Sequence, residues 1–367
     1  MPKVSVILPC YNVGKYIERC LACLINQTLT DIEIICVNDK STDNTWDIIS
    51  QYANDDKRIV AIDLKQNSGA AIARNTGMDI ASGEYIGFVD PDDYVDHNFF
   101  EELYACAIKN NSDVVKGNVR ITDSNTGNVT MSAWHNVIKQ NIVSFTAHFW
   151  SAIYKRTFIH KHNIRFPGEI HTSQDAVFLC IVALNSPVIT FVDNVFYNYL
   201  YRRPGSLDSS ILTHAKAQSK LSAFNMNLNI IAKYPLSKHA CRDFVFYHVF
   251  RHLYYEFDKT FENPADRKEI FDLLHKIYKM FFSKRYMHMH NTKQYIKYIK
   301  RNNYDACIES MKLARTRLYL FGFIPFIRID QIANKTRIIL FDIFPCITTK
   351  NNKIYLFEYF LILKIRK

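Results

Sequence analysis

The stretch Glu84-Tyr85-Ile86-Gly87-Phe88-Val89-Asp90-Pro91-Asp92-Asp93 ends an apolar, strand-like run on a cluster of acids. Three carboxylates (Asp90, Asp92 and Asp93) follow within four positions. Crowded carboxylates repel one another, so they are stable at close range only when a cation shares them. A divalent metal ion that carries a phosphorylated ligand is the usual cation, because hard ions bind carboxylate oxygens and leave positions for phosphate. Taken alone, the cluster is better interpreted as a solvated turn, and its neighbours change that interpretation.

Strand-like and helix-like patterns alternate on the N-terminal side of this stretch. The strand-like runs lie at 4–9, 32–37 and 58–64, and the helix-like patterns lie between them at 16–25, 46–52 and 69–80. This alternation predicts an α/β fold with a mostly parallel sheet and right-handed crossovers. In such sheets, ligands bind beyond the carboxyl ends of the strands.

Three of these strand ends carry polar residues. They are Pro9-Cys10-Tyr11-Asn12, Asn38-Asp39-Lys40-Ser41 and the acids at Asp90–Asp93. Because parallel strands end at one edge, we expect these side chains to converge on a ligand there.

Composition bounds the class of protein. The chain has 367 residues, 14% of them aromatic, which is enough for a sizeable core. The opening residues carry no signal-peptide pattern, and no apolar run approaches the roughly 18 residues that span a bilayer. The nine cysteines are scattered, and the pair Cys20 and Cys23 lies in a helix-like stretch, which favours core packing over redox chemistry. These features predict free thiols in a reducing cytoplasm.

Charge divides the chain. Residues 1–205 carry 18 Lys and Arg against 22 Asp and Glu, whereas residues 206–367 carry 28 against 13. We therefore predict a first domain over 1–205, a mainly helical region over 206–310 and a basic, aromatic tail over 311–367. The tail holds three similar segments, at Arg317–Ile329, Arg337–Ile347 and Lys353–Ile365.

Two interpretations of the tail remain open. The segments could be three hairpin-like units that pack on the body of the protein. Alternatively, they could form a basic, aromatic surface that lies on an anionic membrane. Composition favours the second interpretation, which predicts a protein held peripherally on the inner face of a bacterial inner membrane.

The blocks Val4–Asn12, Val37–Asp43, Asn67–Gly77 and Ala81–Asp93 together resemble the opening of family 2 glycosyltransferases of the GT-A fold. The pair Gln27-Thr28 belongs to the same pattern. The match weakens over 110–165 and returns at Ser173–Phe178 and Tyr197–Ser206. The tail resembles those of bacterial transferases that build surface glycans such as lipopolysaccharide or capsule.

The resemblance implies a reaction and its residues. It implies an inverting, metal-dependent enzyme that moves one sugar from a UDP-sugar to a hydroxyl of a glycan or lipid-linked acceptor. Asp175 would be the catalytic base, and Asp93 with Asp92 would hold Mn²⁺ or Mg²⁺. The residues implied to bind the nucleotide-sugar are Pro9, Tyr11, Asn12, Asp39, Asn67, Arg74 and Asp92.

Three roles stay open at this point. Asp90 could orient the turn instead of binding. Arg74 could bind the nucleotide or form an ion pair with Asp79 or another acid. Lys40 stands where the family commonly has Gly, so it either pays backbone strain or brings its ammonium group to the diphosphate.

Two further departures bear on the acceptor. Gln174 replaces the usual Glu before the base, which keeps hydrogen bonding and loses a charge. The Gln-x-x-Arg-Trp pattern of processive synthases is absent, so we expect addition of a single sugar.

Other function classes fit less well. A haloacid dehalogenase-type phosphatase also has Asp-x-Asp after a strand, but its nucleophile follows the first strand, and here the acids follow the fourth. Net charge of +11 supports only non-specific attraction to nucleic acid, and the motifs of specific binders are missing. An inactive scaffold with this fold remains an alternative.

Overall fold

A computed structural model describes residues 1–132, 148–201, 214–233, 257, 264–281 and 293–313, together with the strands within 316–364. The chain forms two compact units, Met1–Asp266 and Arg267–Lys367. We describe each unit by itself. The limits expected at 205 and 310 stay predictions.

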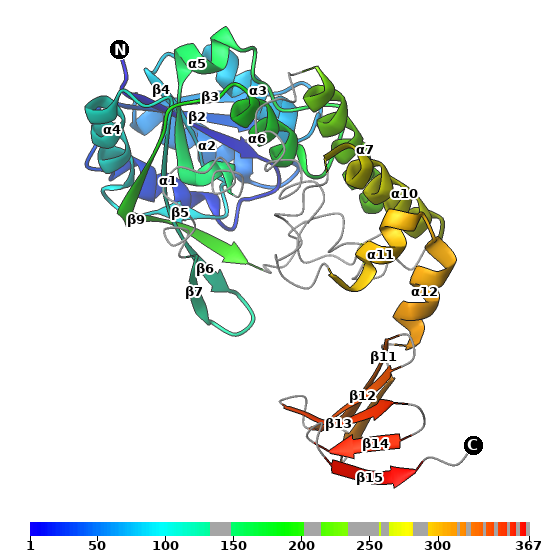
Figure 1. The fold of residues 1–367 in the computed structure, drawn as a ribbon. Coiled ribbons are helices and arrows are strands. Elements are labelled where there is room, and N and C mark those ends of the chain that lie inside the picture. The colour runs from blue at the N-terminus through cyan, green and yellow to red at the C-terminus, as the bar shows by residue number, and fades with distance from the viewer. Residues whose placement is uncertain are drawn as a thin grey trace. The chain divides into compact units, whose positions relative to one another are not determined.

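The first unit is built on one mixed sheet (Figure 1). Its strands run in the order β3-β2-β1-β4-β8-β6-β9-β5, with β7 paired to β6. The strands are β1 (Val4–Cys10), β2 (Ile32–Asn38), β3 (Ile59–Asp63), β4 (Tyr85–Phe88), β5 (Tyr94–Val95), β6 (Val114–Asp123), β7 (Val129–Ser132), β8 (Ala152–Lys155) and β9 (Ile189–Tyr201).

Strands β1 to β4 are all parallel, as the alternating pattern predicted. Strand β8 pairs antiparallel to β4 and to β6, and β9 runs parallel to β6. The predicted α/β fold is therefore confirmed, with a parallel half that carries the polar strand ends and a mixed half beside it.

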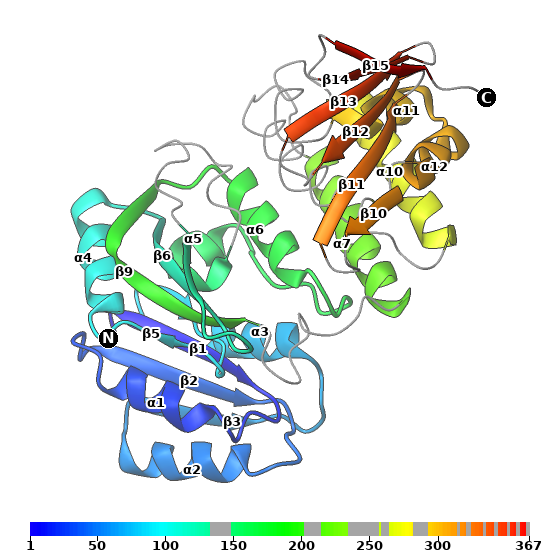
Figure 2. The ribbon, with the colours of Figure 1, turned by 90° about the horizontal axis from the view of Figure 1, so that it is seen from below.

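The helices of the first unit cover both faces of the sheet. They are α1 (Ile17–Ile25), α2 (Thr45–Asp55), α3 (Ala70–Ile80), α4 (Phe99–Asn110), α5 (Arg156–Lys161), α6 (Gln174–Leu184) and α7 (His214–Ala232), with a short 3-10 turn, η3 (Phe149–Ser151). Right-handed crossovers place α1 and α2 on one face and α3 on the other (Figure 2).

The core explains why these segments form. In β1, residues Val4, Val6, Ile7 and Leu8 are fully buried, as expected for a central parallel strand covered on both faces. Helix α3 packs closely on β1. A Cβ added at Gly77 would lie only 2.5 Å from Cγ2 of Ile7, so the absence of a side chain at Gly77 permits this packing. Cys20 is also fully buried and unpaired, in agreement with core packing.

An aromatic cluster joins helix α6 to strand β4. The rings of Phe166 and Phe178 stack with centroids 4.2 Å apart, and Phe178 meets Phe88 of β4 at 5.8 Å. Phe149 and Tyr154 complete the cluster around Phe88. Aromatic pairs at such separations contribute beyond the area that they bury, so this cluster fixes α6 on the strand that ends in the acids.

The second unit combines helices with an antiparallel sheet. Helix α10 (Pro264–Phe281) begins at the boundary and is followed by α11 (Lys293–Arg301) and α12 (Tyr304–Leu313). Within the described part of the chain, no helix has the length and apolar character needed to cross a membrane.

The three similar tail segments correspond to three hairpins. They are β10 (Thr316–Leu320) with β11 (Ile324–Ile332), β12 (Lys335–Leu340) with β13 (Phe344–Lys350), and β14 (Lys353–Leu356) with β15 (Phe360–Lys364). Each hairpin has a shift in register within its first strand. The interpretation as hairpin-like units therefore agrees with the backbone, and membrane contact stays a prediction.

Candidate active site

The carboxyl ends of β1, β2 and β4 meet at one edge of the sheet. Cys10 pairs with Asn38, and Ile7 pairs with Phe88. Beyond these pairs, the Asp39 amide donates to the Cys10 carbonyl at 2.8 Å, and the Val89 amide donates to Ile7 at 3.1 Å. The polar residues that follow the three strands therefore begin from adjacent positions, as predicted.

Asp39 organises the loop that leads into α3. Its carboxylate is buried, and the two oxygens accept the backbone N–H groups of Ser68 (2.6 Å) and Gly69 (2.7 Å). Gly69 has a φ of 87°, which a residue with a Cβ rarely adopts. The Asn67 amide donates to the Asp39 carbonyl at 3.1 Å. Two predicted nucleotide-binding residues are thus joined, and each Asp39 oxygen keeps a further lone pair.

The segment after β1 contributes an exposed ring. Tyr11 is 47% exposed, and Pro9 lies half-buried within β1. Asn12 takes a left-handed conformation with a φ of 51°. The side-chain oxygen of Asn12 accepts a hydrogen bond from the Thr42 backbone N–H at 2.8 Å. The backbone N–H of Asn12 donates to Ser41 Oγ at 3.0 Å. Asn12 therefore braces the loop after β2, while Tyr11 presents an aromatic surface.

Lys40 takes the backbone conformation that the first of its two open roles requires. Its φ is 59°, so a residue other than glycine occupies a left-handed position and carries strain. Its ammonium group lies 3.3 Å from Asp63 Oδ2, and the Asn38 amide donates to the other oxygen of Asp63 at 2.7 Å. In this structure the Lys40 charge faces Asp63 at the end of β3.

We call residues Asp90–Asp93 the acid turn. The Asp93 amide donates to the Asp90 carbonyl at 2.9 Å and closes the turn. Arg19 of α1 donates to the Asp92 carbonyl at 2.7 Å, and its guanidinium lies 4.8 Å from the ring of Tyr94. The half-buried Asp92 is thereby held through its backbone.

Asp93 is enclosed by the protein. It is only 1% exposed, and its oxygens accept the Leu200 amide (2.9 Å) and the Tyr197 hydroxyl (3.0 Å). Burial, followed by the negative charges of Asp92 and Asp90, raises the pKa of Asp93 well above its usual range. Both oxygens of Asp93 thus accept hydrogen bonds from β9, and the metal-ligand role expected for Asp93 stays a prediction.

Arg74 lies between an acid and aromatic rings. It is 9% exposed, and its Nη2 is 2.8 Å from Asp90 Oδ1. Asp79 instead pairs with Arg165 at 2.9 Å. The buried Nε of Arg74 has no hydrogen-bond partner among the described residues. Of the two roles left open for Arg74, an ion pair is present, and its partner belongs to the acid turn.

Asp175 is the second residue of α6 and is exposed. Ser173 stands at the N-cap with a φ of 60° and makes no side-chain cap hydrogen bond. Gln174 is buried, and its amide donates to the Ile170 carbonyl at 2.6 Å, a bond that a Glu carboxylate could not donate. One turn further on, Phe178 packs against β4. The part of the Tyr-rich block at 202–206 lies outside the described residues.

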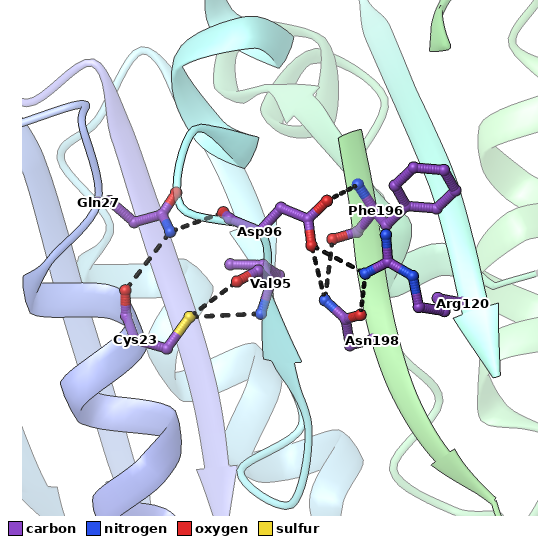
Figure 3. A network of polar contacts seen from close by, with 7 residues as sticks. All are labelled: Cys23, Gln27, Val95, Asp96, Arg120, Phe196 and Asn198. Carbon is purple, nitrogen blue, oxygen red and sulfur yellow. Dashed lines mark hydrogen bonds and ion pairs between the residues drawn. The ribbon is translucent and has the colours of Figure 1, made fainter. Parts of the chain in front are cut away.

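Sequence reasoning missed the residues that support the acid turn from a distance. Arg19 belongs to α1, and Tyr197 and Leu200 both belong to β9. The Tyr-rich block at Tyr197–Ser206 was the only available signal, and it did not indicate which residues its side chains would contact. Figure 3 shows a second missed feature, a polar network around Asp96 that joins α1, β5, β6 and β9.

In this network the Asp96 carboxylate accepts Arg120 Nη1 (3.1 Å) and Asn198 Nδ2 (3.0 Å), and the Phe196 amide donates to its other oxygen at 3.1 Å. The Gln27 side chain donates to the Asp96 carbonyl at 2.9 Å. Because these bonds join the residues that follow the acid turn to β9, they fix the part of β9 that reaches Asp93.

The acid turn offers oxygen donors of the kind that a divalent ion binds. Among the described residues, no group of three or more His, Cys, Asp and Glu side chains is arranged to hold a metal. A nucleotide-bound ion needs fewer protein ligands, because phosphate and water complete its shell. The carboxylates of Asp90 and Asp92, both partly exposed on one short turn, have the hard oxygen donors that fit such an ion.

The chain is similar in sequence and in fold to known proteins. Residues 5–173 match the family described as Glycosyl transferase family 2. The chain is 31% identical over 264 residues to the glycosyltransferase EpsJ of Bacillus subtilis, which covers 69% of this chain and 76% of EpsJ. The chain belongs to glycosyl transferase family 2. It is also 35% identical over 210 residues to the poly(ribitol-phosphate) beta-glucosyltransferase of Bacillus spizizenii, with 55% of this chain and 33% of that protein covered.

The fold of this family 2 protein matches a solved structure. TarS of S. aureus (residues 1–349), crystallised with UDP-GlcNAc, superimposes with a TM-score of 0.66 at 22% identity, over 92% of this chain and 97% of that one. This similarity confirms the expected GT-A type of fold. The chain spans about a third of the length of two of the curated relatives that it matches.

Proposed function

We propose that this family 2 protein transfers a single sugar from a UDP-sugar to a hydroxyl of a glycan or lipid-linked acceptor. The observation that carries the proposal is the convergence of Asp39, the Asn67–Gly69 loop and the acid turn on one edge of the parallel strands. The TarS structure contains UDP-GlcNAc on a similar fold, which supports a uridine nucleotide as the donor's carrier.

The nucleotide would be held by rigid groups. The exposed ring of Tyr11 offers a stacking surface for a base. Asp39 is fixed by two backbone N–H groups, so its remaining lone pairs point in set directions and can accept the uracil N–H. Pro9, Asn12 and Asn67 shape the loops around these two residues.

For the metal we propose Asp92 as the principal ligand, with Asp90 beside it and Asp93 as their internal support. When bound, Mn²⁺ or Mg²⁺ supplies neutralisation of the charge that develops on the leaving diphosphate. Arg74 neutralises Asp90 within the protein, and the contacts of Asp93 with β9 hold the turn in shape.

For the catalytic base we propose Asp175. It is exposed and lies in the first turn of α6. The positive end of the helix dipole favours its ionised form, which is the form that can accept a proton from the acceptor hydroxyl. A single base without a covalent intermediate implies inversion at the anomeric carbon.

The acceptor class follows from the relatives alone. The Bacillus spizizenii relative is described as acting on poly(ribitol-phosphate), a polymer with many hydroxyl groups. We propose that the acceptor here is likewise a hydroxyl of a bacterial surface polymer, among which lipopolysaccharide and capsule remain candidates.

We further propose that the second unit binds an anionic inner-membrane surface. Residues 267–367 contain 21 Lys and Arg against 7 Asp and Glu, and Lys297, Lys300 and Arg301 of α11 are exposed. Each cation near such a surface contributes about 1 kcal/mol at most. The full chain should sediment with vesicles that contain phosphatidylglycerol at low salt and should stay in the supernatant with neutral vesicles. Equal sedimentation with both would refute membrane binding by charge.

The donor proposal is tested with a panel of UDP-sugars. The full chain should release UDP from one of them when Mn²⁺ or Mg²⁺ is supplied, and EDTA should stop the release. Asp92→Asn should abolish the metal-dependent release of UDP, whereas Asp47→Asn, which changes an exposed acid on α2, should leave it unchanged. If no UDP-sugar is bound or cleaved under any of these conditions, the proposed donor is wrong.

A further inference from the structure

Tyr197 connects the two ends of the acid turn through one hydroxyl group. The Asp90 backbone N–H donates to the Tyr197 oxygen at 2.9 Å, and the Tyr197 hydroxyl donates to Asp93 Oδ2 at 3.0 Å. The Asp93 amide also donates to the Asp90 carbonyl. These three hydrogen bonds hold the two ends of the acid turn together, with Asp92 between them in the chain.

The position requires the chemistry of a phenol. One hydroxyl must accept from a backbone N–H and donate to a carboxylate, which Phe cannot do. Tyr197 is fully buried, so water cannot replace the hydroxyl without a local rearrangement. Loss of the oxygen would leave the Asp90 N–H and one oxygen of Asp93 without these partners in a buried place, and both belong to the acid turn.

The surroundings hold the Tyr197 ring in one place. It lies 4.1 Å from the ring of Trp150 and 6.5 Å from that of Phe99. On the same strand, Phe196 and Asn198 bond to Asp96, as Figure 3 shows. The two chain neighbours of Tyr197 are therefore fixed by hydrogen bonds, which fixes the position of Tyr197 relative to the acid turn.

We propose that Tyr197 is a positioning residue that sets the affinity of the acid turn for a metal–nucleotide complex. It acts through Asp90 and Asp93, which place Asp92, and does not itself touch the ligand. This inference rests on the proposed function, because it assumes that Asp92 binds the ion that accompanies UDP.

The test compares Tyr197→Phe with a matched control, Tyr85→Phe. Tyr85 lies on β4, is 1% exposed, and donates its hydroxyl to the Ser112 carbonyl at 2.8 Å. Tyr197→Phe loses two buried hydrogen bonds and Tyr85→Phe loses one, so both variants should unfold at a lower temperature than the wild type. Binding of UDP is then measured by titration calorimetry on the full chain, with Mn²⁺ and with EDTA.

We expect Tyr197→Phe to weaken UDP binding in the presence of Mn²⁺ by about tenfold or more, because two groups of the turn lose a partner at once. Binding in EDTA should match the wild type, and Tyr85→Phe should match it under both conditions. Equal Mn²⁺-dependent affinity in Tyr197→Phe and the wild type would overturn the inference and leave the proposed function intact. No UDP binding by the wild type would overturn both.

A second variant keeps the test decisive if Tyr197→Phe does not fold. Trp150→Phe retains the hydroxyl but removes part of the packing that holds the ring. It should lower the Mn²⁺-dependent affinity by a smaller factor, about threefold. An unchanged affinity in folded Trp150→Phe would then refute the positioning role.

Discussion

Arg74 and Asp90 form an ion pair, with 2.8 Å between Nη2 and Oδ1, whose cation is enclosed by aromatic rings. The guanidinium carbon lies 4.9 Å from the ring centroid of Phe149 and 5.3 Å from that of Phe166. Because the same rings pack against α6, Arg74 links the acid turn to the helix that carries Asp175. The pair places a positive charge beside the acids before any ligand arrives.

Replacing Arg74 with Lys should therefore be costly although the charge is kept. Lys lacks the flat guanidinium that stacks on both rings and reaches Asp90. We expect a loss of about 1–3 kcal/mol in the free energy of unfolding, together with weaker binding of UDP with Mn²⁺. Arg165→Lys is the matched control, because its pair with Asp79 is more exposed, and it should change stability by no more than about 0.5 kcal/mol. Equal effects in chemical denaturation would contradict the special role of Arg74.

Asp175→Asn should separate binding from chemistry. An Asn side chain keeps the shape of Asp but cannot accept a proton at neutral pH. Once the donor sugar is known, kcat should fall by about 10²–10⁴, while the calorimetric affinity for UDP with Mn²⁺ should stay within twofold of the wild type. Glu169→Gln changes an exposed acid of the preceding segment and should leave kcat unchanged. A variant Asp175→Asn with normal kcat would remove Asp175 from the role of base.

The strain at Lys40 can be measured with two substitutions. Lys40→Gly relieves the left-handed conformation and removes the ammonium group, whereas Lys40→Ala removes only the ammonium group. We expect the Gly variant to be more stable than the Ala variant by about 1 kcal/mol in urea denaturation. Both should bind UDP as the wild type does, because the Lys40 ammonium faces Asp63. A large loss of UDP affinity in both variants would show instead that the ammonium reaches the diphosphate.

Lys116 of β6 gives the molecule a predictable response to pH. It is 1% exposed, its Nζ donates to the His148 carbonyl at 3.3 Å, and burial lowers the pKa of Lys116 to about 7. The unfolded chain, with a pKa near 10.4 for Lys, binds more protons than the folded chain between about pH 7 and pH 10. Stability contributed by this group therefore rises with pH across that window, and its full cost is present below pH 7.

Lys116→Met should remove this cost. The variant should be more stable than the wild type near pH 7, by up to about 4 kcal/mol, and the difference should shrink as the pH approaches 10. Tryptophan fluorescence can follow the unfolding, because all three tryptophans lie within residues 1–266. Lys109→Met changes an exposed lysine of α4 and should show no such trend. A pH-independent difference for Lys116→Met would mean that Lys116 stays charged when folded.

The elements that the sequence predicted well are those with a local cause. The runs at 4–9 and 32–37 form β1 and β2 almost to the residue, because a buried parallel strand is a continuous apolar run. The helix expected at 69–80 is α3 at Ala70–Ile80. Polar residues at the strand ends could be placed together from topology alone.

What the sequence could not predict depends on contacts between distant segments. The burial of Asp93 comes from Tyr197 and Leu200, which lie more than a hundred positions away. No local pattern separates the buried Asp93 from the half-buried Asp92. The charge of Lys116 likewise gave no sign of its burial, since lysine is rarely enclosed.

The distance along the chain between the acid turn and its partners has a consequence for biosynthesis. The four motif blocks leave the ribosome within the first 93 residues, but the hydroxyl and amide that enclose Asp93 arrive only with residues 197 and 200. A nascent chain that already displays the whole nucleotide-binding signature therefore has a loose acid turn until β9 docks. The chain would therefore be able to bind a donor only after β9 has joined the sheet, and not as soon as the four motif blocks have been synthesised.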